Sequence, residues 1–405
     1  MRYDIIIVGA SFAGLTLAHH LPKNYRILLL DKKPSLDSPV ETTGLITNPT
    51  KDEFNSFRSL HIEKYISNSI YGLNVVNFRY TDVFSSSTEH PWIFSLNTAA
   101  LIKHLTATLP SNVTIKLNAV YGSPNTYFHD GKTHNFKAKF IIGADGANSS
   151  VAKSNPNLSQ NKKHLIGLEK VFHGEIDQKA IYHFWFGEFS LGYGGWLSPN
   201  GPNQFRVGLA KYNDGNGFET LNRFIDRLKK EGFIRPEGEA IEQFGSHIPI
   251  GGPIKKPYDK KTLLIGDAAG LCGAFAADGI KGALISAKVA AKLIQKGSFR
   301  GYYMEIEKHN YLMSYFKRQK LYRFAWDQMK TNESFDLLFD LVKNEDLVDV
   351  FCDSKDKHKS LAGSLIKLKN IPKLAKYGAS ILKGKINSMG LDSNSVYDVC
   401  SGPNN

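Results

Sequence analysis

A glycine-containing loop near the start of the chain restricts the fold more strongly than any other feature. The string GASFAG at residues 9–14 follows the apolar run DIIIV and precedes LTLAHHL, whose leucines have helical spacing. A second apolar run, YRILLL, comes next. Strand, glycine turn, helix and strand within residues 3–31 predict a βαβ unit, which requires neighbouring parallel strands. We therefore expect the chain to open as a doubly wound α/β sheet.

The same loop has the features of a phosphate-binding turn. Gly9 permits a tight turn, Gly14 lets the helix lie close to the strand, and the positive end of the helix offers backbone N–H groups to a pyrophosphate. Ser11 stands where a second glycine is usual, so its small side chain must tilt away from the phosphate or hydrogen-bond to it. Asp31, about 20 residues on, is placed to accept hydrogen bonds from a ribose diol. These residues predict a dinucleotide site; the alternative is a tight turn without a ligand.

Two later segments repeat the pattern of an apolar run that stops at glycine and aspartate. They are AKFIIGADGANSS at 138–150 and KTLLIGDAAG at 261–270, and they predict further strands of one sheet. The carboxylate of Asp267 is placed to bind a ribityl hydroxyl. Gly279 and Ile280 begin a predicted helix whose positive end points at the pyrimidine edge of a flavin. Because FAD is long and needs contacts beyond the first loop, these segments favour FAD over a nicotinamide cofactor.

The composition changes twice along the chain. Residues 165–210 alternate aromatic and polar side chains and contain a Pro-Asn-Gly turn, which predicts an antiparallel sheet in a second, inserted domain. Residues 301–350 are rich in Tyr, Phe, Leu and Lys at a spacing that predicts helices. The expected domains are an FAD-binding domain at 1–75, 98–155 and 255–300, a substrate-binding sheet domain at 76–97 and 156–254, and a basic helical region at 301–405.

An excess of positive charge predicts an anionic partner. The chain has 51 Lys and Arg against 38 Asp and Glu, a formal net charge of +13. Lysines without any acid lie among spaced Leu and Ile residues at 361–386, a basic amphipathic pattern interrupted by Pro372. This stretch either contacts an anionic membrane surface or is a solvated face of a packed helix. Nucleic acid is less favoured, because the sequence contains no recognised binding motif.

The cysteines and the apolar opening indicate where the chain functions. Cys272, Cys352 and Cys400 never form a CxxC pair, which argues against a disulfide framework and against a zinc or other metal site. The apolar opening from Ile5 to Ala18 spans 14 residues, too few for a membrane-spanning helix, and lacks the features of a signal peptide. We expect a cytoplasmic protein with peripheral membrane contact.

Several strings resemble known signatures. VGASFAGL with Asp31, GADGANSSVAK, and LLIGDAAGL with DGIKGAL resemble those of FAD-dependent oxidoreductases with the aromatic-hydroxylase type of fold, over about residues 1–300. The string FWFGEFSLGYGGWLSPNGPNQFRVGLA is similar to the geranylgeranyl reductase family. The chain departs from that family at Thr42, where many members have a cysteine, and at Asn97 and Thr98, where many have an arginine nearby. The resemblance implies FAD contacts at Ala13, Asp31, Thr42, Thr43, Val120, Asp267, Gly279 and Ile280.

The inserted segment concentrates aromatic residues within a short stretch. Together they predict the roof of an apolar tunnel that fits a polyprenyl chain and its isolated C=C bonds, whereas the alternative for any one of them is core packing. Alkene reduction also needs a proton, and its candidate donors, chosen only by their closeness to the motifs, are Tyr193, His183 and Cys272. The expected substrate-binding residues are Tyr182, Phe184, Phe186, Tyr193 and Trp196.

Three hypotheses for function follow. The first is an FAD-dependent reductase of polyprenyl double bonds, acting in membrane ether lipid biosynthesis or on a free prenyl diphosphate. The second is a flavin-dependent monooxygenase or halogenase, although the WxWxIP string typical of halogenases is absent from the sequence. The third is a non-catalytic isoprenoid-binding protein. A second dinucleotide loop is also absent, so NAD(P)H and a small redox protein both remain candidate electron donors.

Overall fold

The computed structural model describes residues 2–36, 38–58, 60–77, 83–123, 125–309 and 311–342, together with 376 and 378–379. Apart from those last three positions, the basic stretch at 361–386 lies outside the described residues. So do Cys352, Cys400 and the end of the predicted helical region.

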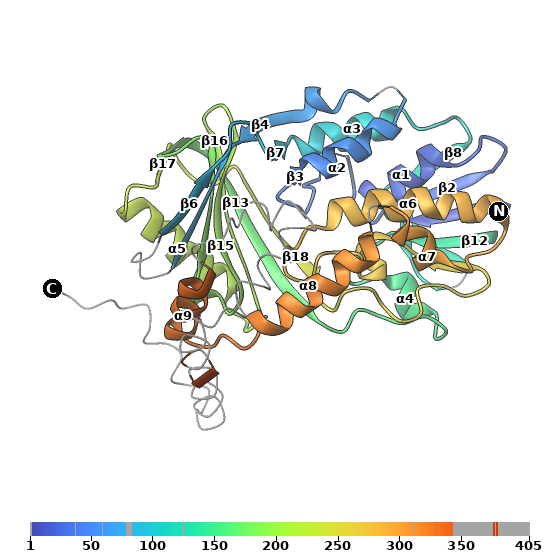
Figure 1. The fold of residues 1–405 in the computed structure, drawn as a ribbon. Coiled ribbons are helices and arrows are strands. Elements are labelled where there is room, and N and C mark those ends of the chain that lie inside the picture. Colours follow the sequence, from blue (N-terminus) through green and yellow to red (C-terminus); the bar gives the residue numbers. More distant parts are fainter. Residues whose placement is uncertain are drawn as a thin grey trace. The chain divides into compact units, whose positions relative to one another are not determined.

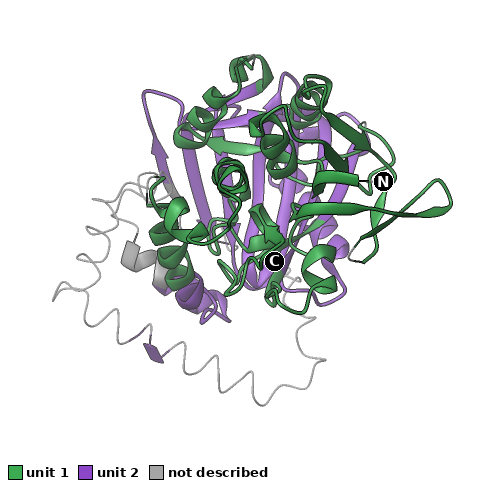
Figure 2. Cartoon of the chain, turned by 90° about the vertical axis from the view of Figure 1, so that its right-hand side faces the viewer, with its two compact units in different colours: residues 1–66, 96–164, 246–322 green, residues 67–95, 165–245, 323–405 purple. Residues whose placement is uncertain are grey.

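The chain forms two compact units, each made of three segments (Figure 2). Unit 1 contains residues 1–66, 96–164 and 246–322, and unit 2 contains residues 67–95, 165–245 and 323–405. The domain boundaries expected from the sequence stay a prediction.

Unit 1 is organised around a five-stranded parallel sheet in the order β19-β12-β1-β2-β8 (Figure 1). In register, Ile5 lies opposite Phe140 of β12 and opposite Ile27 of β2. Every residue of β2 is buried, as expected for a strand that is covered on both faces. The βαβ opening and the two later strands are therefore confirmed. The strands are β1 (Arg2–Val8), β2 (Ile27–Leu30), β8 (Val113–Lys116), β12 (Lys137–Gly143) and β19 (Thr262–Leu264).

Helices cover this sheet, and α1 lies beside α6 (Figure 1). The predicted start of α6 at Gly279 is confirmed. Asn97 precedes α3 and caps it, because its side-chain oxygen accepts a hydrogen bond from the N–H of Ala100 at 3.0 Å. The helices are α1 (Phe12–His20), α2 (Asn48–Glu53), α3 (Thr98–Ala107), α4 (Ser150–Ser154), α6 (Gly279–Lys296), α7 (Tyr302–Glu307) and α8 (Leu312–Trp326), whose residues up to 322 belong to unit 1.

Short elements complete unit 1. A three-stranded antiparallel sheet consists of β9 (Val120–Tyr121), β10 (Thr126–His129) and β11 (Lys132–Asn135). The remaining elements are β3 (Leu45–Thr47) and the 3-10 turns η1 (Phe54–Ser56), η2 (Ile62–Tyr65) and η4 (Gly266–Ala269).

Unit 2 is built on a sheet in the order β17-β13-β16-β15-β14-β5-β6. Most neighbouring strands are antiparallel, as predicted, but β14 and β5 run parallel, with Phe184 opposite Val75. That pair joins segments far apart in the sequence, so no local turn signal indicated it. The strands are β5 (Gly72–Asn77), β6 (Val83–Ser87), β13 (His164–Ile176), β14 (Ile181–Phe186), β15 (Gly192–Gly201), β16 (Gln204–Lys211) and β17 (Ile234–Pro236).

One face of this sheet packs against α5 (Gly217–Lys230). The buried side of α5 carries Leu221, Phe224, Ile225 and Leu228, an amphipathic spacing of three and four residues. They share a core with Trp185, Phe205 and other residues of the strands. Phe189 of η3 (Glu188–Ser190) also packs against this core. The remaining elements are β4 (Ile66–Ile70), β7 (Ile93–Leu96), β18 (Glu242–Pro249) and α9 (Asn332–Val342).

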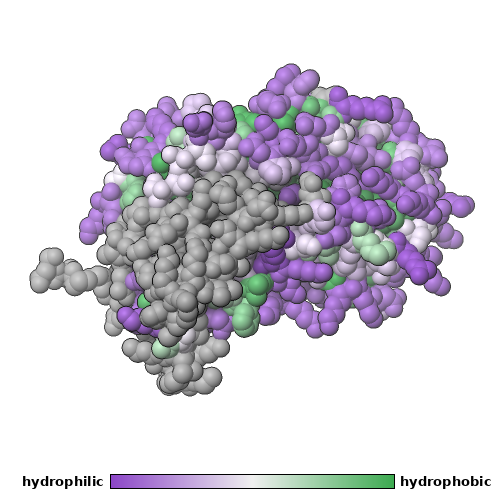
Figure 3. All heavy atoms as spheres, in the orientation of Figure 1, coloured by the Kyte–Doolittle hydropathy of each residue, from purple (hydrophilic) through white to green (hydrophobic). Residues whose placement is uncertain are grey.

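One face of the surface is drawn by residue hydropathy in Figure 3. Hydrophilic residues predominate on the face drawn in Figure 3, apart from the atoms shown in grey. Among the helices of the described ranges, none is both long enough and apolar enough to cross a membrane.

Candidate cofactor and substrate sites

The loop after β1 can be formed only with glycine at two positions. Gly9 has φ +106°, and a Cβ atom there would fall 2.2 Å from the carbonyl oxygen of Ala144. A Cβ on Gly14 would fall 1.8 Å from the carbonyl oxygen of Gly9, so α1 packs directly on the turn. Both glycines therefore have the structural roles that the sequence predicted for them.

The carboxylate of Asp31 connects this loop to the end of β2. Its Oδ2 accepts a hydrogen bond from the N–H of Ala10 at 2.6 Å, and its Oδ1 accepts one from the N–H of Lys33 at 2.8 Å. The side chain is 8% exposed, and the exposed part faces a pocket. This is the crevice at the carboxyl ends of the strands, where open α/β sheets bind ligands.

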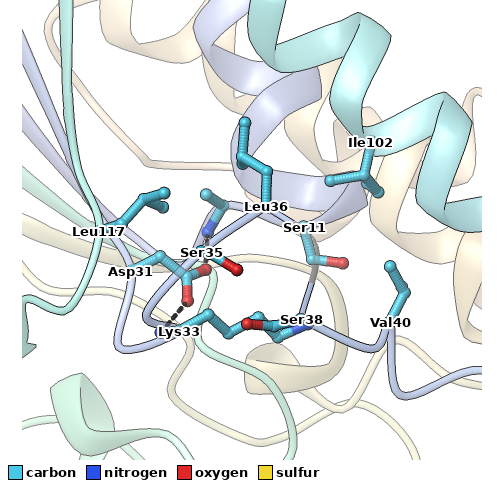
Figure 4. Close-up of a pocket in the computed structure, with 10 residues that line it drawn as sticks. Ser11, Asp31, Lys33, Ser35, Leu36, Ser38, Val40, Ile102 and Leu117 are labelled. Atoms are coloured by element: carbon cyan, nitrogen blue, oxygen red, sulfur yellow. Dashed lines mark hydrogen bonds between the residues drawn. The ribbon is translucent and has the colours of Figure 1, made fainter.

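Ser11 and Asp31 line that same pocket (Figure 4). Ser11 is the N-cap of α1 but makes no side-chain capping bond. Sequence reasoning missed the rest of the lining, most of which comes from the Ser- and Pro-rich segment after β2. The lining residues are Ala10, Ser11, Asp31, Lys33, Ser35, Leu36, Ser38, Val40, Ile102 and Leu117.

The pocket combines features that a nucleotide-binding site needs. Three features lie together in unit 1: the tight turn at Gly9, the amino end of α1 and the buried carboxylate of Asp31 at the end of β2. Val120 is close to this site, because the preceding Ala119 donates its N–H to the carbonyl of Asp31 at 2.8 Å. Thr42 lies two residues after the pocket residue Val40, and its hydroxyl oxygen accepts a hydrogen bond from the N–H of Gly44. Thr43 is partly buried beside it.

A second group of predicted residues meets where η4 approaches α6. Ala13 of α1 packs close to Gly266, where a Cβ would fall 3.1 Å from the Ala13 Cβ. The next residue, Asp267, lies against the start of α6, since a Cβ on Gly279 would fall 2.7 Å from its Oδ1. Burial of the Asp267 carboxyl, followed by the negative charge of Asp278, raises its pKa to about 6. Gly279 and Ile280 are the first two residues of α6.

The aromatic residues of unit 2 divide between the two faces of its sheet. Phe184 contacts Tyr193 edge-on with ring centroids 5.3 Å apart, and Tyr193 contacts Trp196 at 6.2 Å. Tyr182, Phe184 and Tyr193 are partly buried, whereas Phe186 is fully buried and Trp196 is 6% exposed. Burial raises the pKa of Tyr182 well above its usual range. The structure thus brings Phe184, Tyr193 and Trp196 together and places Phe186 in the interior.

A buried ion pair is hydrogen-bonded to Trp196 of this aromatic group. Arg206 and Glu169 form a salt bridge at 3.0 Å with little exposure of either side chain, and the second oxygen of Glu169 accepts a hydrogen bond from Trp196 Nε1 at 2.9 Å. The pair joins neighbouring strands β13 and β16, so its members are 37 residues apart in the sequence. Sequence reasoning did not identify it.

The three candidate proton donors have different surroundings. His183 stacks on Trp185 and contacts Phe233, on the side of the sheet that α5 covers. Its burial lowers the pKa to about 4, so the imidazole is neutral at pH 7. Cys272 is buried beside Asp267 and Asp278, and burial followed by these charges raises the pKa of its thiol. Tyr193 belongs to the aromatic group of unit 2, and the role of each candidate stays a prediction.

No protein-family model matches the chain. Among curated proteins, digeranylgeranylglycerophospholipid reductase 1 of Methanosphaera stadtmanae is 26% identical over 396 residues, which cover 92% of this chain and 91% of that protein. The protein of the same name from Methanococcoides burtonii is 24% identical over 315 residues, covering 72% of this chain and 75% of that protein. These similarities confirm the resemblance to the geranylgeranyl reductase family and the prediction of an oxidoreductase.

Solved structures confirm the fold class. A geranylgeranyl bacteriochlorophyll reductase-like protein from Thermoplasma acidophilum matches with a TM-score of 0.74 at 18% identity, covering 94% of this chain and 99% of that one. The p-nitrophenol 4-monooxygenase of Pseudomonas putida matches with a TM-score of 0.65 at 16% identity, covering 89% and 97%. A flavin-dependent brominase matches with a TM-score of 0.60 at 14% identity, covering 90% and 97%.

Proposed function

We propose that this chain is an FAD-dependent reductase of isolated C=C bonds in polyprenyl chains, acting in the biosynthesis of membrane ether lipids. The relatives named digeranylgeranylglycerophospholipid reductase support the substrate class. The observation that carries the cofactor assignment is the Asp31 carboxylate, which is fixed by the Ala10 N–H and faces a pocket at the carboxyl ends of the strands.

In the proposed complex, the residues of unit 1 hold the cofactor at two places. Asp31 accepts hydrogen bonds from the adenosine ribose, and the backbone of Gly9 to Gly14, with the Ser11 hydroxyl, binds the pyrophosphate at the amino end of α1. Asp267 binds the ribityl chain, and the backbone of Gly279 and Ile280 holds the ring edge. FAD bound in this way would supply the hydride that alkene reduction requires.

Unit 2 provides the proposed contacts to the lipid chain. Tyr182, Phe184 and Tyr193 are only partly buried, which suits contact with an apolar chain, while the more deeply buried Phe186 and Trp196 support them. These rings orient the double bond and exclude water. The Glu169–Arg206 pair keeps the Trp196 indole in place through its Nε1 hydrogen bond.

The proposed partners follow from charge and chemistry. A net charge of +13 favours an anionic membrane surface, from which a cytoplasmic, peripherally bound enzyme would take its lipid. Electrons come from NAD(P)H or from a small redox protein. Co-sedimentation with vesicles that contain anionic lipid should decrease as salt increases; binding that is independent of salt would contradict the electrostatic part of this proposal.

The test of the central proposal is an anaerobic experiment. Purified protein reconstituted with FAD is reduced chemically and mixed with a digeranylgeranyl glycerophospholipid. We expect the flavin to reoxidise and the lipid to gain two mass units for each reduced bond. A protein that cannot be reconstituted with FAD would support the non-catalytic isoprenoid-binding alternative instead.

A second candidate function is a flavin-dependent monooxygenase or halogenase. The structural similarity to a monooxygenase and to a brominase favours it. Under this alternative the reduced protein would reoxidise only when oxygen is admitted, and the product would contain an added oxygen or halogen atom. The anaerobic lipid experiment therefore separates the two functions.

A further inference from the structure

The segment from Leu271 to Asp278 connects η4 to α6 and leads directly into Gly279. Ala277 within it has φ +58°, a left-handed conformation that residues other than glycine seldom adopt. The N–H of Ala277 donates a hydrogen bond to the carbonyl of Gly273 at 2.8 Å. A backbone of this kind costs free energy and persists only where its surroundings hold it.

Gln319 of α8 holds the middle of the segment. Its Oε1 accepts hydrogen bonds from the N–H groups of Phe275 at 3.2 Å and Ala276 at 2.7 Å. The Gln319 side chain is only 4% exposed, so water does not compete well for these two donors. One buried amide thus fixes two consecutive backbone groups immediately before the left-handed Ala277.

Tyr315 holds the end of the segment. It lies one turn before Gln319, so both side chains project from the same face of α8. The Tyr315 hydroxyl is 2.7 Å from each carboxylate oxygen of Asp278, the residue that precedes α6. A Cβ on Gly273 would fall 2.0 Å from Asp278 Oδ1 and 2.9 Å from the Tyr315 hydroxyl oxygen, so the backbone itself packs against this pair.

We propose that Tyr315 and Gln319 are positioning residues of the cofactor site, which hold residues 273–278 so that the backbone of Gly279 and Ile280 meets the flavin ring. This inference rests on the proposed function. Neither residue belongs to the strand-end motifs, and both come from a helix more than 30 residues further along the chain. Gln319 acts through backbone N–H groups and Tyr315 through the carboxylate of Asp278, and neither acts by contact with the substrate.

Several charged and titratable groups surround Asp278, and they indicate what the Tyr315 hydroxyl does. Asp267 of η4 and Cys272 of the segment itself lie near Asp278. Lys281 of α6 lies near the other partner, Tyr315, with its ammonium 5.5 Å from the centroid of that ring. The hydroxyl of Tyr315 disperses the negative charge of Asp278 by hydrogen bonding. Without it, more negative charge would remain at the end of α6 that faces the reduced ring.

Three variants of the full-length holoprotein test the proposal. Gln319→Met keeps the volume but removes the acceptor, and we expect FAD to bind about tenfold more weakly, because two backbone hydrogen bonds are lost. Gln319→Glu keeps an acceptor at the same place and should bind FAD more tightly than Gln319→Met, although burial of its carboxyl keeps the affinity below the original value. Tyr315→Phe removes only the hydroxyl and should make the midpoint potential of bound FAD more negative.

A matched control separates these effects from general loss of packing. Tyr303→Phe removes a partly buried hydroxyl in the same unit that donates to the carbonyl of Ile254 at 2.7 Å, and it should change neither FAD affinity nor potential. If Gln319→Met and Tyr315→Phe both keep the affinity and the potential of the original protein, the inference is wrong while the proposed function stands. Should Gln319→Met not fold, Tyr315→Phe decides by the potential alone. Failure of the unmodified protein to bind FAD would instead refute the proposed function.

Discussion

Asp31 Oδ2 accepts a hydrogen bond from the backbone N–H of Ala10 at 2.6 Å, so the end of β2 is tied to the turn that follows β1. The bond places a carboxylate and the amino end of α1 on the same pocket. Asp31 therefore holds the turn, and the proposed function gives the same carboxylate a second task, the binding of a nucleotide.

Replacement of Asp31 by alanine should weaken FAD binding about 10- to 100-fold, because hydrogen bonds to a charged group contribute about 1.5–3 kcal/mol. Titration of the apoprotein with FAD, followed by fluorescence, measures the change. Asp226→Ala, at an exposed carboxylate of α5, is the control and should leave affinity unchanged. Equal affinities for the Asp31 variant and the original protein would place the nucleotide elsewhere.

Gly9→Ala should destabilise unit 1 by about 3 kcal/mol or more, because the added Cβ would meet a backbone carbonyl. Gly131→Ala is the matched control: it also has a positive φ of +73°, but nothing lies within 4 Å of its Cβ position. It should cost only about 1–2 kcal/mol, the penalty of the conformation alone. Chemical denaturation of both variants measures the difference, and similar losses would show that the close approach to Ala144 is unimportant.

The raised pKa of Asp267 predicts a pH dependence of stability. Folding raises this pKa from about 3.9 in the unfolded chain to about 6, so the folded state binds more protons between these pH values. The stabilisation that comes from the protonated Asp267 carboxyl is fully present below pH 4 and is lost as the pH rises through 6. Its size is on the order of 1–3 kcal/mol.

Denaturation of FAD-free protein at several pH values tests this expectation. Asp267→Asn should have a flatter stability profile between pH 4 and 6 than the original protein. Asp278→Asn should move the loss of stability to lower pH, because it removes the second cause of the shift. Profiles of the same shape in all three proteins would contradict the assigned pKa.

Breaking the ion pair in unit 2 should be costly. Arg206→Met leaves the buried carboxylate of Glu169 without its cation, and the expected loss of unfolding free energy is about 3–5 kcal/mol. Adding Glu169→Gln removes the unpaired charge and should recover a large part of that loss, while its amide still accepts from Trp196 Nε1. A double variant no more stable than Arg206→Met would mean that packing, and not charge, dominates at this position.

Local patterns in the sequence were sufficient to predict the framework of unit 1. A short apolar run that ends at glycine identified β1, and runs that end at glycine and aspartate identified β12 and β19. The start of α6 was predicted at the correct residue. These features depend on neighbouring residues, because a buried parallel strand and a tight turn both require particular side chains in sequence.

Contacts between distant residues could not be predicted in this way. The parallel pairing of β14 with β5 joins strands about 110 residues apart, and Gln319 reaches Ala276 across 43 residues. The residues next to Gln319, and those next to β14, do not indicate which distant segment each one contacts. The pocket lining between Lys33 and Val40 was missed for a related reason, since an irregular segment has no periodicity that reveals which side chains face inward.

In the proposed FAD complex, the carboxylate of Asp31 would also select among nucleotides by charge repulsion. A ribose that carries a phosphate on its 2′-oxygen would bring a second negative charge to a side chain that is already held in place by two backbone donors. In the proposed complex, this pocket would therefore discriminate against 2′-phosphorylated dinucleotides, and a cellular excess of such molecules would not displace an occupant with an unmodified ribose.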